Sequence, residues 1–130
     1  MNESRSAAPV RLLIIDDERG FVSALAKRLA KRNIQVTHAY SGREGIQVLR
    51  RSDFDVVLLD LKMEDIDGFE VLKIIKIMVP ELPVIMLSGH ASDETARTGK
   101  KAGAYDYLTK PYDLSQLIEK IHSAIDEGHE

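Results

Sequence analysis

The sequence predicts an α/β fold, in which a five-stranded, mostly parallel sheet is doubly wound with helices on both faces. Short apolar runs typical of buried strands alternate five times with stretches whose apolar residues recur at helical spacing. Alternating units of this length require right-handed crossovers between parallel strands. The 130 residues contain no internal repeat and suffice for one domain with a single core.

The first two strands differ in character. Residues 11–15 form an apolar run, and the helix after it places Phe21, Leu25 and Leu29 at helical spacing, with Asn33 closing it. Residues 34–38 alternate between apolar and polar, which indicates a strand with one wetter face. The second helix, which runs to about residue 51, is expected to begin with a capping box formed by Ser41 and Glu44.

The central strand is the most apolar segment. Residues 56–59 are Val-Val-Leu-Leu, which indicates a strand covered on both faces, and the run ends on the carboxylate of Asp60. A charge at the end of a buried strand is unfavourable unless something satisfies it. The next helix is predicted to begin after Asp67, with Asp65 as a turn residue, and to stop at Pro80.

The last two strand–helix pairs differ in how clearly the sequence predicts them. Residues 84–87 form the fourth strand, and the helix predicted over 92–101 is the weakest, because its apolar residues are alanines and Gly99 lies inside it. Gly103 can end that helix, and residues 104–108 are predicted to form the fifth strand. Asp113 is expected to cap the final helix, whose apolar stripe is Leu114, Leu117, Ile118, Ile121 and Ile125.

Composition limits the function. Hydrophobic residues make up 44% and charged residues 30%, as in ordinary soluble proteins, and a net charge of −3 gives no strong attraction to nucleic acid or anionic lipid. The absence of cysteine excludes a disulfide framework, a thiolate metal site and a cysteine nucleophile. No apolar run approaches the roughly 18 residues that span a bilayer, and residues 1–9 lack the apolar core of a signal peptide. We therefore expect a cytoplasmic protein without direct contacts to nucleic acid or membrane.

Polar groups follow four of the predicted strands. They are Asp16 and Asp17 after the first, Asp60 after the third, Ser88 after the fourth and Lys110 after the fifth. Ligands of open parallel sheets bind at the carboxyl ends of the strands, so we expect these groups to converge on one edge.

Such a group of side chains suits phosphate and metal chemistry. Clustered carboxylates raise one another's pKa values unless a cation is present, and oxygen ligands without histidine or cysteine favour Mg²⁺ or Mn²⁺. A lysine and a serine hydroxyl can bind phosphoryl oxygens, and a carboxylate can act as a nucleophile toward phosphorus.

These motifs resemble those of the response regulator receiver domain of two-component signal transduction. The resemblance rests on Asp16-Asp17, residues 60–63 with Asp67-Gly68, Ser88-Gly89 and Lys110-Pro111, which agree in order and spacing. It covers about residues 10–127, leaving residues 1–9 as a flexible N-terminal tail and residues 128–130 as a C-terminal tail. It implies a flavodoxin-like three-layer sandwich with strand order 2-1-3-4-5, as in chemotaxis regulators.

The resemblance also implies roles for the metal-binding residues. Asp60 would accept a phosphoryl group from a phosphohistidine on a sensor histidine kinase or phosphotransfer protein. Mg²⁺ (or Mn²⁺) would be bound by Asp17 directly, by Asp16 through water, by Asp60 and by the backbone carbonyl of Lys62. One departure is Glu64, where the family commonly has proline.

Further roles concern the phosphoryl group and the output. Ser88 and Lys110 would hold the phosphoryl oxygens, Tyr107 would be the aromatic switch, and the Lys110-Pro111 peptide is usually cis in the family. The fourth helix, fifth strand and fifth helix would form the output surface for an effector, an output domain or a second copy of the chain. The protein would be a signalling domain that assists its own phosphorylation and dephosphorylation, rather than an enzyme with an external substrate.

Other interpretations of single residues stay open. Asp17 could be a helix N-cap, and either Tyr105 or Tyr107 should belong to the core. The scattered histidines are interpreted as surface or loop residues: His38, His90, His122 and His129.

Other functions stay open as well. A phosphatase with a nucleophilic aspartate would need an acid at position 62, where Lys62 stands. A nucleotide or flavin carrier would need a glycine-rich loop after the first strand, where the sequence is acidic. A docking module that is never phosphorylated would not need the complete set of acids, serine and lysine. The chain is either a stand-alone receiver or the N-terminal domain of a longer regulator.

Overall fold

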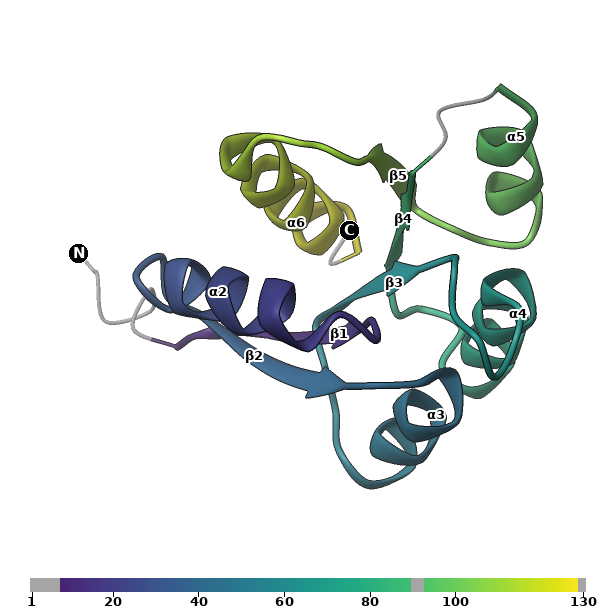
Figure 1. The fold of residues 1–130 in the computed structure, drawn as a ribbon, viewed down its shortest axis with the longest axis horizontal. Coiled ribbons are helices and arrows are strands. Elements are labelled where there is room, and N and C mark those ends of the chain that lie inside the picture. The colour runs from purple at the N-terminus through teal and green to yellow at the C-terminus, as the bar shows by residue number, and fades with distance from the viewer. Residues whose placement is uncertain (1–7, 90–92, 129–130) are drawn as a thin grey trace.

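A computed structural model describes residues 8–89 and 93–128, which form an open sheet of five parallel strands in the order β2-β1-β3-β4-β5 (Figure 1). This confirms the predicted fold class and strand order. Of the predicted tails, residues 1–7 and 129–130 lie outside the described part of the chain, as do residues 90–92, including the predicted start of the fourth helix. The strands are β1 (Val10–Ile15), β2 (Ile34–Ala39), β3 (Val56–Asp60), β4 (Val84–Ser88) and β5 (Asp106–Thr109).

The helices form two layers around this sheet. Helices α2 and α6 cover one face, and α3, α4 and α5 cover the other (Figure 1). The helices are α2 (Arg19–Ala30), α3 (Gly42–Arg51), α4 (Gly68–Met78), α5 (Asp93–Lys101) and α6 (Leu114–Gly128). None of the helices in the described ranges is long and apolar enough to cross a bilayer.

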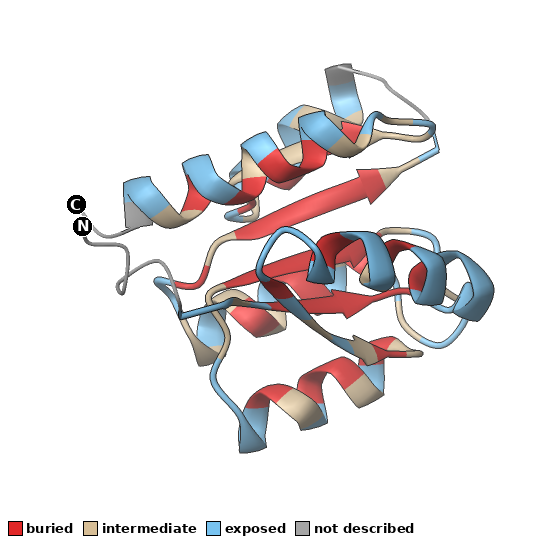
Figure 2. Ribbon diagram, turned by 90° about the vertical axis from the view of Figure 1, so that its left-hand side faces the viewer, coloured by how far each residue is buried: buried red, intermediate tan, exposed pale blue. Residues whose placement is uncertain are grey.

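The central strands carry the core. Every residue of β3 is buried, and so are the last four residues of β1, which pairs with it (Figure 2). Residues of these strands alternate between two apolar clusters, one against α2 and α6 and one against α3 and α4. A strand covered on both faces explains why the sequence shows a continuous apolar run there rather than alternation.

Local signals set the ends of the helices. The Glu44 backbone N–H donates to the Ser41 hydroxyl at 3.1 Å, and the Glu44 carboxylate accepts from the Tyr40 N–H at 2.7 Å. The capping box is therefore present, but the Glu44 carboxylate accepts from Tyr40, the residue before the Ser41 cap, rather than from Ser41 itself. Asn33 and Gly103 follow α2 and α5 with positive φ angles of 63° and 107°, which confirms their predicted roles as helix ends.

Two predictions about individual positions were wrong. Phe21 is 40% exposed, whereas its neighbour Val22 is buried with Leu25 and Leu29, because the buried stripe of α2 begins one residue later. The fifth strand runs over Asp106–Thr109 rather than 104–108. Its ladder continues past the strand through a 2.8 Å bond from the Lys110 N–H to the Ser88 carbonyl, which aligns the ends of β4 and β5.

Gly99 has a packing reason within α5. It is buried against the sheet, and a Cβ atom there would overlap the end of the Met86 side chain from β4. The glycine that weakens this helix in isolation therefore lets the helix lie close to the sheet.

Candidate functional site

Three carboxylates meet at the carboxyl edge of the sheet. Asp16 follows β1 directly, Asp60 is the last residue of β3, and Asp17 begins the turn into α2. Each offers one oxygen atom, and these atoms all lie within 4.8 Å of one another. Asp16 and Asp60 are buried, whereas Asp17 is exposed. The predicted convergence of these acids is confirmed, and the exposed position of Asp17 gives the cluster an opening to solvent.

Asp16 is held by several contacts. Its backbone N–H donates to the Ala39 carbonyl at 3.1 Å, and its Oδ1 atom accepts from the Glu18 N–H at 2.9 Å. Its Oδ2 atom is buried and accepts no hydrogen bond from any residue in the described ranges. Burial, and after it the nearby charge of Asp60, raises the pKa of Asp16 to about 6, although the bond from Glu18 opposes the shift.

Asp60 is nearly as enclosed as Asp16 and also has a neighbour of opposite charge. Burial raises its pKa, while the 3.1 Å hydrogen bond from the Lys62 N–H to Oδ1 and the charge of Lys110 oppose the shift. Its Oδ2 atom lies 3.8 Å from the Lys110 Nζ atom. One oxygen of this carboxylate is thus fixed by the loop and the other faces the lysine.

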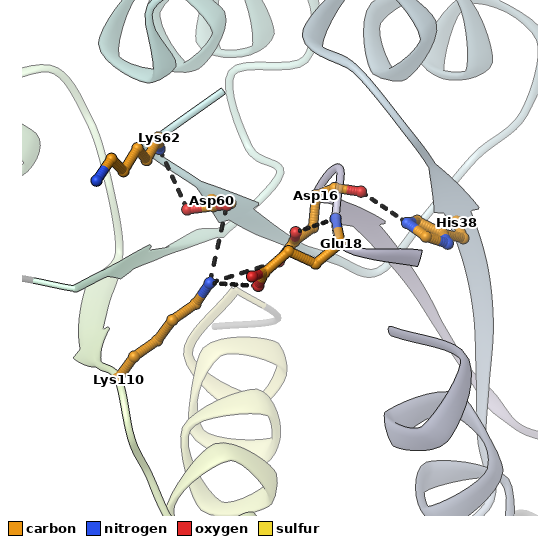
Figure 3. Close-up of polar contacts among 6 residues, drawn as sticks. All are labelled: Asp16, Glu18, His38, Asp60, Lys62 and Lys110. Atoms are coloured by element: carbon orange, nitrogen blue, oxygen red, sulfur yellow. Dashed lines mark hydrogen bonds and ion pairs between the residues drawn. The ribbon is translucent and has the colours of Figure 1, made fainter. Parts of the chain in front are cut away.

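Lys110 brings a positive charge into the cluster from the far side of β4. Its Nζ atom lies 3.1 Å from Glu18 Oε1, 3.8 Å from Asp60 Oδ2 and 3.9 Å from Asp16 Oδ2 (Figure 3). Burial lowers the pKa of this amino group, but the carboxylates outweigh burial and raise the pKa above its ordinary value. The Lys110-Pro111 peptide bond is cis, as the resemblance implied.

Glu18 is a member of the cluster that the motif comparison did not single out. It is the closest carboxylate to Lys110 and is itself largely exposed. A third acid directly after Asp16-Asp17 was the available signal, but a helix-initiating glutamate has the same appearance in a sequence.

The remaining predicted residues lie around the acids. Ser88 ends β4 and is paired in register with Thr109, so it stands at the same edge. Tyr107 lies further back on β5, opposite Met86, and is half-buried. The Lys62 side chain is exposed and extends away from Asp60 (Figure 3). Tyr105 is half-buried as well and packs on the opposite face, so both tyrosines contact the core, not one of the two.

The loop between β3 and α4 is anchored by two of its acids. Asp67 caps α4 by accepting from the Phe69 N–H at 3.0 Å, as predicted. Asp65 instead reaches the start of another helix and accepts from the N–H groups of Gly42 and Arg43 at 3.1 and 3.0 Å. Partial burial opposes the effect, but these bonds lower the pKa of Asp65. No sequence pattern links residues 65 and 42, so this second cap could not be predicted.

The arrangement fits a hard divalent cation. The donors are carboxylate oxygens from Asp16, Asp17 and Asp60, and the buried Oδ2 atom of Asp16 has no hydrogen-bond donor among the described residues. Mg²⁺ is commonly held by one or two protein carboxylates together with water and a phosphate. A lysine beside these acids can contact a phosphoryl oxygen, so the chemistry that the geometry supports is phosphoryl transfer to a carboxylate.

The family model of the response regulator receiver domain matches residues 12–122, which include all of the acids and Lys110. This chain belongs to that family. It is therefore the receiver domain of a two-component response regulator.

Relatives of this receiver domain include full-length regulators. The transcriptional regulatory protein GlrR of Escherichia coli is 36% identical over 123 residues, which cover 95% of this chain and 28% of that protein. The cell cycle response regulator CtrA of Brucella ovis is 34% identical over 122 residues, covering 92% of this chain and 53% of CtrA. The chain thus spans from about a quarter to about half of the curated relatives that it matches.

Solved structures show the same fold. The receiver domain of the Francisella response regulator 1452 is 30% identical, with a TM-score of 0.85 and coverage of 91% of this chain and 98% of that one. A CheY-like receiver domain protein from Methanospirillum hungatei is 30% identical, with a TM-score of 0.88 and coverage of 94% and 98%.

Proposed function

We propose that this receiver domain is a Mg²⁺-dependent phosphoacceptor, in which Asp60 takes a phosphoryl group from a sensor histidine kinase or phosphotransfer protein. One observation carries the proposal. The Asp60 carboxylate, 4% exposed at the end of a central strand, lies within 4.8 Å of two further carboxylates and 3.8 Å from an ammonium group. Mere loop acids would not be buried together beside a lysine.

The proposed transfer uses the side chains that meet in this cluster. An oxygen of Asp60 attacks the phosphorus atom of a phosphohistidine, the P–O bond forms as the P–N bond breaks, and the imidazole nitrogen keeps the electron pair. Asp16, Asp17, Asp60 and the Lys62 carbonyl would hold Mg²⁺, which would supply positive charge to neutralise the phosphoryl oxygens. Lys110 and the Ser88 hydroxyl contact those oxygens, which stabilises the charge that develops during transfer.

The output surface is proposed to comprise α5, β5 and α6, with Tyr107 as the switch residue. Among α5 residues whose side chains are described, Gly99 alone is buried, so few apolar contacts hold this helix. A helix with few buried contacts can have two positions that differ little in free energy, which suits a two-state switch. The surface would engage an effector, an output domain or a second copy of the chain in the cytoplasm. We take residues 10–127 as the receiver unit.

The test is phosphorylation of the purified chain. Incubation with Mg²⁺ and a small phosphodonor such as an acyl phosphate should add one phosphoryl group, detected by intact mass. Asp60→Asn should add none. Asp53→Asn is the matched control, because Asp53 is an exposed aspartate preceding the same strand. Equal labelling of the native chain and Asp60→Asn would refute the assignment of Asp60.

A further inference from the structure

His38 reaches the acidic turn from β2. The sequence predicts a surface or loop residue at this position, but the Nε2 atom of His38 lies 2.7 Å from the backbone carbonyl oxygen of Asp16, and the side chain is half-buried. A carbonyl oxygen only accepts hydrogen bonds, so Nε2 must carry the ring proton. His122, by contrast, is exposed as predicted, and His90 and His129 lie outside the described residues.

The ring of His38 is itself supported by a stack of side chains. It lies 4.1 Å, centroid to centroid, from the ring of Tyr40, and the Arg19 guanidinium lies 3.7 Å over the same tyrosine ring. Arg19 is the first residue of α2. The two ends of the turn that carries Asp16 and Asp17 are therefore both held by side chains at the end of β2.

This support begins where the sheet ladder ends. The Asp16 N–H makes the last backbone bond from this segment to β2, at 3.1 Å to Ala39. After it, the Asp16 carbonyl is bound by the histidine side chain, on the side of the turn opposite the pocket with Lys110 (Figure 3). Like charges on Asp16, Asp17 and Asp60 repel one another, so the turn needs a restraint that keeps its acids facing the pocket.

We propose that His38, supported by Tyr40 and Arg19, is a positioning residue for the divalent-cation site. It contacts no proposed ligand atom; it fixes the backbone from which Asp16 and Asp17 project. This inference rests on the proposed function, because it concerns the Mg²⁺ site of the phosphoacceptor. It goes beyond that function by assigning a role to a strand that contributes no ligand.

The test measures Mg²⁺ binding by titration calorimetry together with the urea midpoint in the absence of Mg²⁺. His38→Phe keeps a ring to stack on Tyr40 but removes the donor, and the Mg²⁺ dissociation constant should rise about two- to tenfold, the scale of one hydrogen bond. His38→Gln offers a side-chain N–H at similar reach and should remain within about twofold of the native chain. His122→Phe is the matched control and should bind as the native chain does.

Several results would overturn the inference. His38→Phe binding Mg²⁺ as tightly as the native chain would do so, as would an equal loss for His38→Gln and His38→Phe. A second measurement needs no variant: nitrogen NMR of the native chain should show His38 as the Nε2–H tautomer, and the Nδ1–H tautomer would contradict the contact. A native chain that binds no Mg²⁺ would instead refute the proposed metal site, while the tautomer would still decide whether His38 holds the turn.

Discussion

At the scale of single residues, burial of the ionised Asp16 carboxyl group lowers the stability of the folded chain. Its pKa is raised from 3.8 to about 6, chiefly by burial. Between these values the folded chain holds a proton that the unfolded chain releases. The free energy of unfolding should therefore fall as pH rises from about 4 to about 6, by at most about 3 kcal/mol, and then level off.

Asp16→Asn isolates this effect. Without Mg²⁺, at pH 7, the variant should be more stable than the native chain, and its own stability should lack the decline between about pH 4 and 6. Urea unfolding in the presence of a chelator, repeated across that pH range, measures both. The same decline in the variant and the native chain would show that another group is responsible.

The sequence could identify site residues that are far apart in the chain when each of them follows or ends a strand. Asp16, Asp60 and Lys110 could be assigned because strand ends are visible as changes from apolar to charged residues. His38 and Asp65 could not, because each acts through a backbone group of a distant residue, which leaves no mark on residue type.

At the scale of elements, the start of α4 fixes the loop that follows Asp60. A Cβ atom on Gly68 would come within 2.5 Å of the Leu61 Cα atom and 2.8 Å of its carbonyl oxygen. Both are backbone atoms, so Gly68→Ala must displace either the helix or the loop. We expect a loss of roughly 1–3 kcal/mol in the free energy of unfolding, together with slower phosphorylation of Asp60.

Gly20→Ala is the control for this prediction. Gly20 also lies in the first turn of a helix, but a Cβ atom there would meet nothing within 4 Å. The change should leave stability unchanged or raise it by up to about 1 kcal/mol. Equal urea midpoints for the two alanine variants would mean that the contact with Leu61 is easily relieved.

The existence and order of the elements could be predicted, whereas some boundaries could not. Strong strands such as β3 are apolar up to their last residue. In β5 every residue except Leu108 is only half-buried, so its limits depend on pairing with β4 rather than on its own residues. Gly99 argues against a helix at α5 on propensity alone, because helix propensity describes an isolated helix. The contact with Met86 arises only after the helix packs on the sheet.

For the whole molecule, cation binding and folding should be linked. The proposed ligands are Asp16 directly after β1, Asp17 in the turn into α2 and Asp60 at the end of β3, so they meet only when the sheet is formed. Mg²⁺ should therefore raise the urea midpoint, and a concentration about 100 times the dissociation constant should add about 2.7 kcal/mol. Asp17→Asn should reduce this gain while changing stability little without Mg²⁺, because Asp17 is exposed. An unchanged midpoint of the native chain with excess Mg²⁺ would contradict the linkage.

Lys110 follows β5, and its side chain lies across β4 from Asp16 and Asp60, which belong to the first half of the chain. During synthesis on the ribosome, those acids emerge long before their only cationic neighbour among the described residues of the pocket. Because those acids meet only when the sheet is formed, a chain that still lacks β4 and β5 would have neither the assembled carboxylates nor the ammonium group. The phosphoryl transfer proposed for Asp60 should therefore become possible only after Lys110, the residue that follows β5, has been synthesised.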